Sequence, residues 1–158
     1  MYDIQVNNDD HRYFTDGILS HNSTMYCIYA LWVTTFFPEK KVMLLANKAA
    51  TALELLGRIT TGYEYLPKWL KAPVVVVNKG ELTFSNMSSI RAFASSSDAA
   101  RGFSCNCVIL DEFAFLNKNV ADKLFTSMYP VISSSKNGKF IIVSTPNGTD
   151  NLYYNIWC

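Results

Sequence analysis

Val108-Ile109-Leu110-Asp111-Glu112 is the stretch of this 158-residue sequence that decides the fold. Its unbroken apolar run predicts a strand that is buried on both faces, and two carboxylates follow where the strand ends. Strands of this kind are typical of parallel sheets, in which ligands bind at the carboxyl ends of the strands. An apolar strand that delivers Asp and then Glu is the Walker B arrangement. There Asp111 would hold Mg²⁺ through its water shell, and Glu112 would act as a general base toward water.

The alternative is an ordinary strand that ends in two solvated acids. The apolar segment Phe113-Ala114-Phe115 follows the two acids directly and argues against ordinary solvent exposure of this loop.

Helices and strands alternate on both sides of this stretch. Apolar patterns predict strands at Lys41–Ala46, Val74–Val77, 82–84, 90–94, 107–110 and 140–143, and helices over 25–36, Ala49–Tyr65 and 120–128. The first helix carries an apolar set at helical spacing: Met25, Ile28, Tyr29, Trp32 and Phe36. Short apolar strands that alternate with helices predict an α/β fold with a mostly parallel sheet and flanking helices.

Composition narrows the class of protein further. A hydrophobic content of 49% is enough for the core of one domain, and a net charge of +1 gives no bulk argument for binding nucleic acid or a membrane. No apolar run approaches the length that spans a bilayer, so no membrane partner is expected. The four cysteines form no CxxC pair, which indicates neither a zinc site nor a redox motif; Cys105 and Cys107 read as small packing residues.

A nucleotide site would also need a phosphate-binding loop, Gly-x-x-x-x-Gly-Lys-Ser/Thr, and the sequence contains none. Ser23-Thr24 nevertheless opens the first predicted helix, where the last residues of that motif would stand. An upstream segment that ends in Gly-Lys and is joined to Ser23 would complete the loop. The Ser23 hydroxyl would then bind Mg²⁺ beside Asp111. A plain helix N-cap is the alternative interpretation of Ser23 and Thr24.

The junction His21-Asn22-Ser23 has the parts needed to cut and rejoin a backbone. The Asn22 side-chain amide can attack its own carbonyl, which forms a cyclic imide and breaks the chain. His21 can donate a proton or hydrogen bond to that carbonyl, and the Ser23 hydroxyl can hold an acyl group as an ester until the break occurs.

Two strands are predicted ahead of the junction: an alternating one at 2–6 and, after a turn cluster at 7–10, a second apolar-rich run in which Gly17 permits a kink. With the junction, this pattern resembles the C-terminal end of an intein over residues 1–22. The resemblance implies that the strands belong to a Hint-type fold and that Asp3 and His11 are assisting polar residues. It also implies that His21 is the penultimate His and Asn22 the cyclising Asn. A surface hairpin with a chance His-Asn pair is the alternative.

Six segments in the rest of the chain carry a second resemblance: 45–52, 63–67, 78–80, 97–102, 110–115 and 143–148. In this order they are similar to the ATPase domain of the large terminase subunit, the DNA-packaging motor of tailed double-stranded-DNA phages. The resemblance implies an incomplete P-loop NTPase-type sheet over residues 23–158. The start of the phosphate loop and the nuclease domain of the family are missing from these residues.

The terminase resemblance implies roles for individual residues. Asp111 and Glu112 would be the Walker B pair, with Ser23 and Thr24 completing the site for ATP and Mg²⁺. Arg101 matches an arginine finger that acts on a neighbouring subunit's nucleotide, with an ordinary surface Arg as the alternative. The motif that couples hydrolysis to movement corresponds to Ser144, Thr145 and Pro146.

The leading hypothesis joins the two resemblances. Splicing, which needs no cofactor, would proceed once with an N-terminal intein half that carries the upstream terminase segment. It would restore an ATPase that moves double-stranded DNA into a capsid. The partners implied are the portal, the small terminase subunit and a ring of identical copies, in the cytoplasm of the host cell. A generic P-loop ATPase or helicase without splicing and a non-catalytic fragment are the alternatives; the segments 113–115 and 144–148 favour terminase over helicase.

Overall fold

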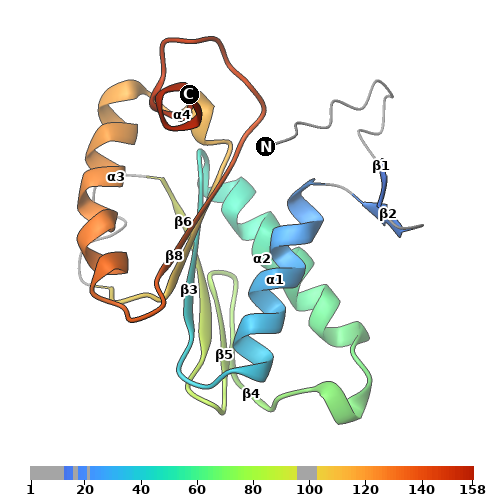
Figure 1. Cartoon of the computed structure of the whole chain (residues 1–158). Helices are drawn as coiled ribbons and strands as arrows, with labels where there is room; N and C mark the ends of the chain where they lie inside the picture. The colour runs from blue at the N-terminus through green and yellow to red at the C-terminus, as the bar shows by residue number, and fades with distance from the viewer. Residues whose placement is uncertain (1–12, 16–17, 21, 96–102) are drawn as a thin grey trace.

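The computed structural model describes residues 13–15, 18–20, 22–95 and 103–158, with side chains from residue 23 onward. Six of the described strands form one mixed sheet in the order β4-β5-β6-β3-β7-β8 (Figure 1). Their bounds are β3 (Lys41–Ala46), β4 (Val74–Val77), β5 (Glu81–Phe84), β6 (Ser89–Ala94), β7 (Cys107–Asp111) and β8 (Lys139–Val143). β6, β3, β7 and β8 run parallel, while the hairpin β4–β5 joins β6 antiparallel.

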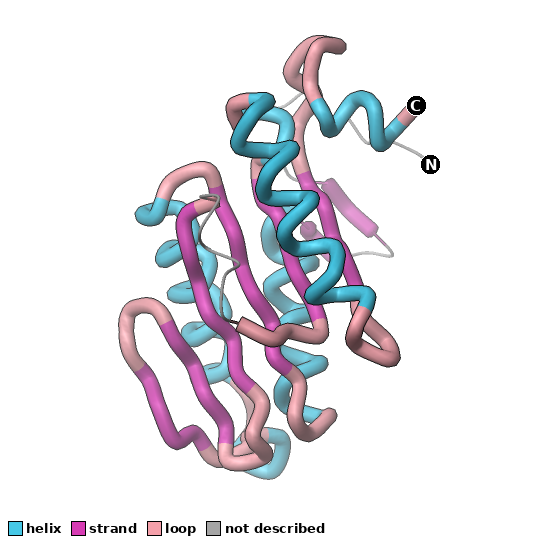
Figure 2. Tube along the Cα trace, turned by 90° about the vertical axis from the view of Figure 1, so that its left-hand side faces the viewer, coloured by secondary structure: helices cyan, strands magenta, loops and turns pink. Residues whose placement is uncertain are grey.

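Helices cover both faces of the sheet. On one face lie α1 (Asn22–Phe36) and α2 (Ala49–Tyr65), and α3 (Lys118–Ser133) crosses the other face, as the two views of Figures 1 and 2 show. The shorter elements are the 3₁₀ helices η1 (Lys68–Leu70) and η2 (Phe113–Phe115) and the helix α4 (Leu152–Trp157). The expected α/β fold with a mostly parallel sheet and flanking helices is therefore confirmed.

β7 is buried along its whole length because apolar layers enclose it on both faces. Cys107 and Ile109 belong to the core formed with α1 and α2, whereas Val108 and Leu110 belong to the core formed with α3. Burial of one such side chain stabilises the fold by about 1.5–3 kcal/mol. The unbroken apolar run predicted from the sequence thus lies at the centre of the sheet and fixes where Asp111 emerges.

The predicted helix over 25–36 is present and starts at Asn22, but the apolar set expected at helical spacing lies largely outward. Ile28 and Trp32 are 56% and 47% exposed, while Ala30 and Leu31, which lie between them in the sequence, are buried. The periodicity predicted the helix correctly and not its core face, because α1 is apolar nearly all round.

Two elements differ from the sequence-based expectation. α3 runs to Ser133 instead of ending near residue 128, although Pro130 lies inside it. It continues because Leu124, Met128 and Ile132 keep one apolar row buried against the sheet, which outweighs the lost backbone hydrogen bond. The short helix α4 was not predicted at all, since six residues are too few for a periodic signal.

A second, separate sheet precedes α1. Its antiparallel strands β1 (Tyr13–Thr15) and β2 (Ile18–Ser20) pair Phe14 with Leu19. The second apolar-rich run, in which a kink was expected to be possible at Gly17, thus contains two short strands. The strand predicted at 2–6, with its turn at 7–10, lies outside the described residues.

Within the described part of the chain, no helix combines the length and apolar character needed to cross a bilayer. All four cysteines lie in described residues and are free. Burial raises the pKa of Cys105 to about 11 and that of Cys107 to about 12, which supports their interpretation as packing residues.

Candidate active site

The predicted site lies where β7, β8 and α1 meet. Asp111 pairs in register with Val143, so the loops that leave the two strands start side by side at the carboxyl edge of the sheet. Asp111 is the last residue of β7 and only 8% exposed, while Glu112 is exposed. This position of a carboxylate is the one at which open α/β sheets bind ligands.

The first turn of α1 packs against Asp111. The hydroxyl of Tyr26 is buried and lies beside both the Asp111 carboxylate and the side chain of Ser23, without reaching hydrogen-bond geometry to either. Burial raises the pKa of Asp111, the charge of Glu112 raises it further, and the Tyr26 hydroxyl opposes this rise. Burial likewise raises the pKa of Tyr26, so its hydroxyl stays a neutral donor.

Glu112 has a strained backbone. Its φ of 52° and ψ of 38° lie in the left-handed region, which costs a residue with a side chain about 1 kcal/mol or more. The sharp turn lets Phe113 and Ala114 return to the core immediately after the two acids. The loop that was expected to resist ordinary exposure does so only in part: Phe113 and Ala114 are buried like Asp111, whereas Glu112 and Phe115 are exposed.

Hydrogen bonds tie this turn to the segment that follows β8. The backbone N–H of Ala114 donates to the Ser144 hydroxyl oxygen at 3.0 Å, and that hydroxyl donates to the Thr145 carbonyl at 2.9 Å. The Asn147 side-chain amide donates to the Ala114 carbonyl at 3.2 Å. Both backbone groups of Ala114 are thus held by the 144–148 segment. A shift of one loop must therefore move the other.

The same segment is held from its far side by the start of α4. The Asn151 side-chain amide donates to the carbonyls of Asn147 and Gly148 at 2.8 and 3.2 Å, and its oxygen accepts from the backbone of Tyr154. The Tyr153 hydroxyl donates to the Ser144 carbonyl at 3.3 Å. The start of α4, a helix that the sequence did not predict, therefore holds the segment that contains the predicted coupling motif through these hydrogen bonds.

The structure brings some of the predicted residues together. Ser23 and Asp111 meet through Tyr26, and Ser144 lies at the neighbouring strand end. The other predicted residues line a different cavity, lie exposed at the surface, or have side chains that the structure does not describe. Thr24 lines a cavity of about 740 Å³ between α1 and α2, which Arg58 also lines, and Thr145 and Pro146 are exposed. Of Asn22 only the helical backbone is described, and Asp3, His11, His21 and Arg101 lie outside the described residues.

Sequence reasoning missed Tyr26. Tyr26 stands three residues after Ser23 in the same helix, and residues at this spacing share a face. That spacing is the signal that could have placed its hydroxyl beside the site.

The side-chain oxygen atoms at this edge of the sheet are suitable ligands for a hard divalent cation. A carboxylate and a hydroxyl are ligands that Mg²⁺ accepts, with the remaining positions filled by water and phosphate oxygens. In the described part of the chain no group of three or more His, Cys, Asp or Glu side chains converges. The Tyr26 hydroxyl, buried beside Ser23 and Asp111 without a hydrogen-bond partner, adds a further oxygen atom to this edge.

The mixed sheet, with helices on both faces and a carboxylate at the end of a central strand, defines an α/β fold of the class that binds ligands at this edge. The comparison with protein families narrows this class: over residues 23–158 the chain matches the model of the terminase large subunit, T4likevirus-type, N-terminal, and it belongs to that family. The match begins at Ser23, the residue that follows the His21-Asn22 pair.

Solved structures share the fold. A variant of the large terminase ATPase domain of Thermus phage P74-26 matches with a TM-score of 0.70 at 22% identity, over 85% of this chain and 58% of that chain. The HK97 bacteriophage large terminase matches at 0.69 and 17%, over 86% and 29%. A large terminase from another thermophilic bacteriophage, solved in complex with ADP, matches at 0.62 and 15%, over 83% and 32%. The chain thus spans little more than half of the ATPase domain that it resembles.

Proposed function

We propose that residues 23–158 are the larger part of the ATP-hydrolysing domain of a phage DNA-packaging motor. The observation that carries this proposal is the position of the Tyr26 side chain, near the start of α1, beside both the buried Asp111 and Ser23. In that geometry the helix N-terminus lies beside the strand-end carboxylates, which suits a nucleotide phosphate with its cation. The substrate would be ATP with Mg²⁺, and the cargo double-stranded DNA.

Each residue has a distinct task in this proposal. Asp111 and Ser23 would hold Mg²⁺, which supplies charge stabilisation to the transferring phosphoryl group when it is bound. Glu112 is exposed at the mouth of the site and would orient the attacking water as a general base. The strained turn at Glu112 fixes its backbone relative to Asp111. Arg101 and Thr24 keep the roles that the family resemblance implies, as arginine finger and as part of the nucleotide site.

The hydrogen bonds between the two loops support a coupling role for Ser144, Thr145 and Pro146. A change at Glu112 would displace Ala114, whose N–H and C=O are held by Ser144 and Asn147. That displacement would reach α4 through Asn151. In our proposal this displacement passes from α4 to further elements. Those elements would bind double-stranded DNA, the portal, the small subunit and neighbouring copies in a ring.

The test uses a contiguous protein in which a segment ending in Gly-Lys is joined directly to Ser23. We expect Mg²⁺-dependent ATP hydrolysis that Glu112→Gln lowers by roughly two orders of magnitude or more, because a positioned base contributes about that much. Ser23→Ala should fold and hydrolyse far more slowly, whereas Ser23→Thr keeps the hydroxyl and retains hydrolysis. The 158-residue chain alone should release no phosphate above its own Glu112→Gln control. An unchanged rate in the contiguous Ser23→Ala protein would contradict the assigned role of Ser23.

We also propose that residues 1–22 act as the C-terminal piece of an intein. Two observations support this. β1 and β2 form a sheet of their own apart from the ATPase sheet, and the family match starts at Ser23, directly after His21 and Asn22. In this scheme Asp3 and His11 assist, His21 activates the carbonyl of Asn22, Asn22 cyclises and Ser23 accepts the acyl group.

Mass spectrometry tests the splicing proposal directly. Mixed with a complementary N-terminal half, the chain should yield a ligated product and release residues 1–22. Asn22→Ala should stop the final cut, because no side-chain amide remains to cyclise, while a branched ester on Ser23 still accumulates. Fully spliced product from the Asn22→Ala chain would refute the role given to Asn22.

A further inference from the structure

Positive charge gathers at one edge of the main sheet. Five strands, β3, β4, β6, β7 and β8, begin at this edge, because β5 runs antiparallel to both β4 and β6. Six lysines and one acid, Glu39, lie in the segments that lead into these strands, with the first strand residue included: 37–41, 66–74, 85–89, 103–107 and 134–139. We call this edge, which is the lower end of the sheet in Figure 1, the lysine rim. The net charge of +1 therefore conceals a strongly basic region.

The lysines of the rim come in pairs at three of the strand entries. They are Lys40 and Lys41 at β3, Lys68 and Lys71 before β4, and Lys136 and Lys139 at β8. Four of the six are exposed and two are half-buried. The ion pairs within the described residues join other side chains, so no acid neutralises any of the six. Like charges that are gathered without acids create a positive potential, which attracts an anionic partner.

The opposite edge of the sheet differs in charge. Asp111 and Glu112 lie there at the end of β7, and Lys118 is paired with Asp150 at 3.0 Å. A long anion is therefore directed toward the lysine rim and away from the edge that carries the proposed nucleotide site.

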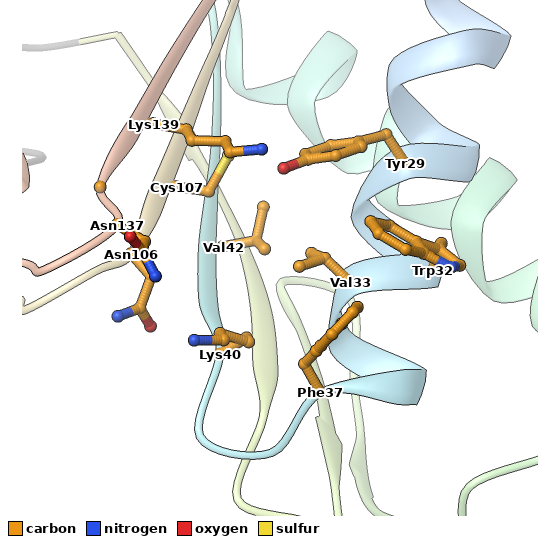
Figure 3. A pocket seen from close by; sticks show the side chains of 11 residues that line it. Tyr29, Trp32, Val33, Phe37, Lys40, Val42, Asn106, Cys107, Asn137 and Lys139 are labelled. Carbon is orange, nitrogen blue, oxygen red and sulfur yellow. The ribbon is translucent and has the colours of Figure 1, made fainter.

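Neutral hydrogen-bonding groups lie among the lysines on both faces of the rim. On the α1 face Lys40 and Asn137 line a hollow of about 570 Å³, which Figure 3 shows. On the α3 face Lys41, Ser104 and Ser134 line a second hollow of about 450 Å³. Lysine ammonium groups, serine hydroxyls and asparagine amides are the side-chain groups that contact the phosphate oxygens of DNA.

The rim also has a length that suits a nucleic-acid backbone. In the order β4-β5-β6-β3-β7-β8 the entries of β4 and β8 are five strand spacings apart, which is about 24 Å. Over that length one strand of a DNA duplex presents about seven phosphates, since they follow one another at about 3.4 Å along the axis. Six lysines spread over the same length are therefore close to the number that such a backbone can engage.

We propose that the lysine rim binds the phosphate backbone of double-stranded DNA, through contacts that do not depend on the base sequence. This inference rests on the proposed function, in which double-stranded DNA is the cargo. The rim would hold the DNA in addition to the elements reached through α4, and it lies at the edge of the sheet away from Asp111. The other class of anionic occupant is an acidic protein. Protein surfaces usually intersperse both signs of charge, whereas a DNA backbone offers the unbroken row of anions that the rim matches.

The test measures binding of the full chain to a fluorescein-labelled DNA duplex of about 30 base pairs, which is longer than the rim. Fluorescence anisotropy is recorded over a series of KCl concentrations. We expect equal affinity for A·T-rich and G·C-rich duplexes, because phosphate contacts carry no sequence information. The logarithm of the binding constant should fall with the logarithm of the salt concentration with a slope of about −3.5 to −5.5, as roughly four to six phosphate contacts produce.

Two triple variants with the same net charge locate the binding surface. The rim variant removes one exposed lysine of each pair: Lys41→Gln, Lys68→Gln and Lys136→Gln. The matched control removes three exposed lysines away from the rim: Lys48→Gln, Lys79→Gln and Lys123→Gln. At low salt the rim variant should bind at least about tenfold more weakly, and its salt slope should be smaller by about 3, roughly one for each lost phosphate contact. The control should bind like the unchanged chain.

The acid of the rim gives an effect of the opposite sign. Glu39 is exposed and lines the same hollow as Lys41, so Glu39→Gln should tighten DNA binding by about threefold. A thermal melt shows whether each variant is folded. If the rim triple is not, Lys136→Gln alone, in an exposed loop, should still reduce the salt slope by about 1.

Three results would overturn the proposal. They are absence of DNA binding by the unchanged chain, equal weakening in the rim and control variants, and displacement of the DNA by polyglutamate at equal charge concentration. The last result would identify an acidic protein as the partner. Hydrolysis is not measured in these experiments, so each of these results leaves the ATPase proposal standing.

Discussion

β7 and β8 are neighbouring parallel strands of equal length and similar apolar composition, yet they differ in burial and in the number of paired edges. Every residue of β7 is buried, and both of its edges are paired. β8 is half-buried, and among the described strands only β7 pairs with it. The difference shows that an apolar run predicts a strand that needs two covered faces and two neighbours, whether or not the chain at hand supplies them. Substitutions in and around the two strands can test this contrast.

The largest effect is expected from truncating a side chain in the finished strand. Ile109→Ala should lower the free energy of unfolding by about 2–5 kcal/mol, because it leaves a cavity in a core that cannot collapse. Ile141→Ala, at the register position beside it in β8, should cost clearly less, since Ile141 is still half-exposed. Urea denaturation of both variants measures the contrast. Equal losses would mean that β8 is as complete as β7.

The same pair should respond differently once an upstream segment is joined to Ser23. If that segment packs against β8 in the contiguous protein, the cost of Ile141→Ala should rise toward that of Ile109→Ala, because its side chain becomes buried. The cost of Ile109→Ala should stay the same. If the Ile141→Ala cost remains unchanged, the upstream segment does not lie against β8.

The contrast also shows how far sequence reasoning reached. The strands β3 and β7, the hairpin β4–β5 and the helix α2 were predicted because each carries a strong local pattern. For α2 this pattern is the buried row of Ala52, Leu55, Leu56 and Ile59 at helical spacing. The core face of α1 was not predictable in this way, because apolar residues surround the helix and the sheet selects the side.

The candidate site was predictable from the sequence only where its residues lie close together in the chain or at the start of a predicted helix. Asp111 and Glu112 are adjacent, and Ser23 starts a helix, so both positions were found. The contact of Tyr26 with Asp111 and the hold of Ser144 on Ala114 join residues 85 and 30 positions apart. Such contacts follow from strand order and helix docking, which no local pattern encodes.

A middle-sized effect is expected where the ends of β7 and β8 are tied together. Ser144→Ala removes the acceptor of the Ala114 N–H and should cost about 1–3 kcal/mol, since that group is left unpaired. Ser133→Ala is the matched control. Its hydroxyl donates only to a helix carbonyl at an exposed position, so its loss should stay within about 0.5 kcal/mol. Thermal melts of the two variants decide whether the tie stabilises the fold.

A smaller, pH-dependent effect is expected at the end of β7. Because the fold raises the pKa of Asp111, the protonated carboxyl is favoured in the folded state. Stability relative to Asp111→Asn should therefore be greatest below the ordinary carboxyl pKa and be lost as the pH rises through the raised value. Urea midpoints of both proteins, measured from about pH 4 to about pH 7, follow this difference. A difference that grows in favour of Asp111 with rising pH would contradict the sign.

The smallest change in stability is expected for Tyr26→Phe, which removes only the hydroxyl beside Asp111. Because the hydroxyl has no hydrogen-bond partner, the free energy of unfolding should change by less than about 0.5 kcal/mol at a pH where Asp111 is protonated. The variant should nevertheless raise the pKa of Asp111 further, because this hydroxyl opposes the rise. The pH window over which Asp111 loses its advantage over Asn should therefore move upward.

In the contiguous protein Tyr26→Phe should also raise the Mg²⁺ concentration needed for half-maximal hydrolysis, with little change in the rate at saturation. A merely structural role for Tyr26 would alter neither the pH window nor the Mg²⁺ requirement. Tyr26 belongs to the buried core, so a loss of stability like that of Ile109→Ala would mean that its hydroxyl acts mainly in packing. An unchanged pH window would separate its hydroxyl from Asp111, and the first turn of α1 would then contribute only Ser23 to the end of β7.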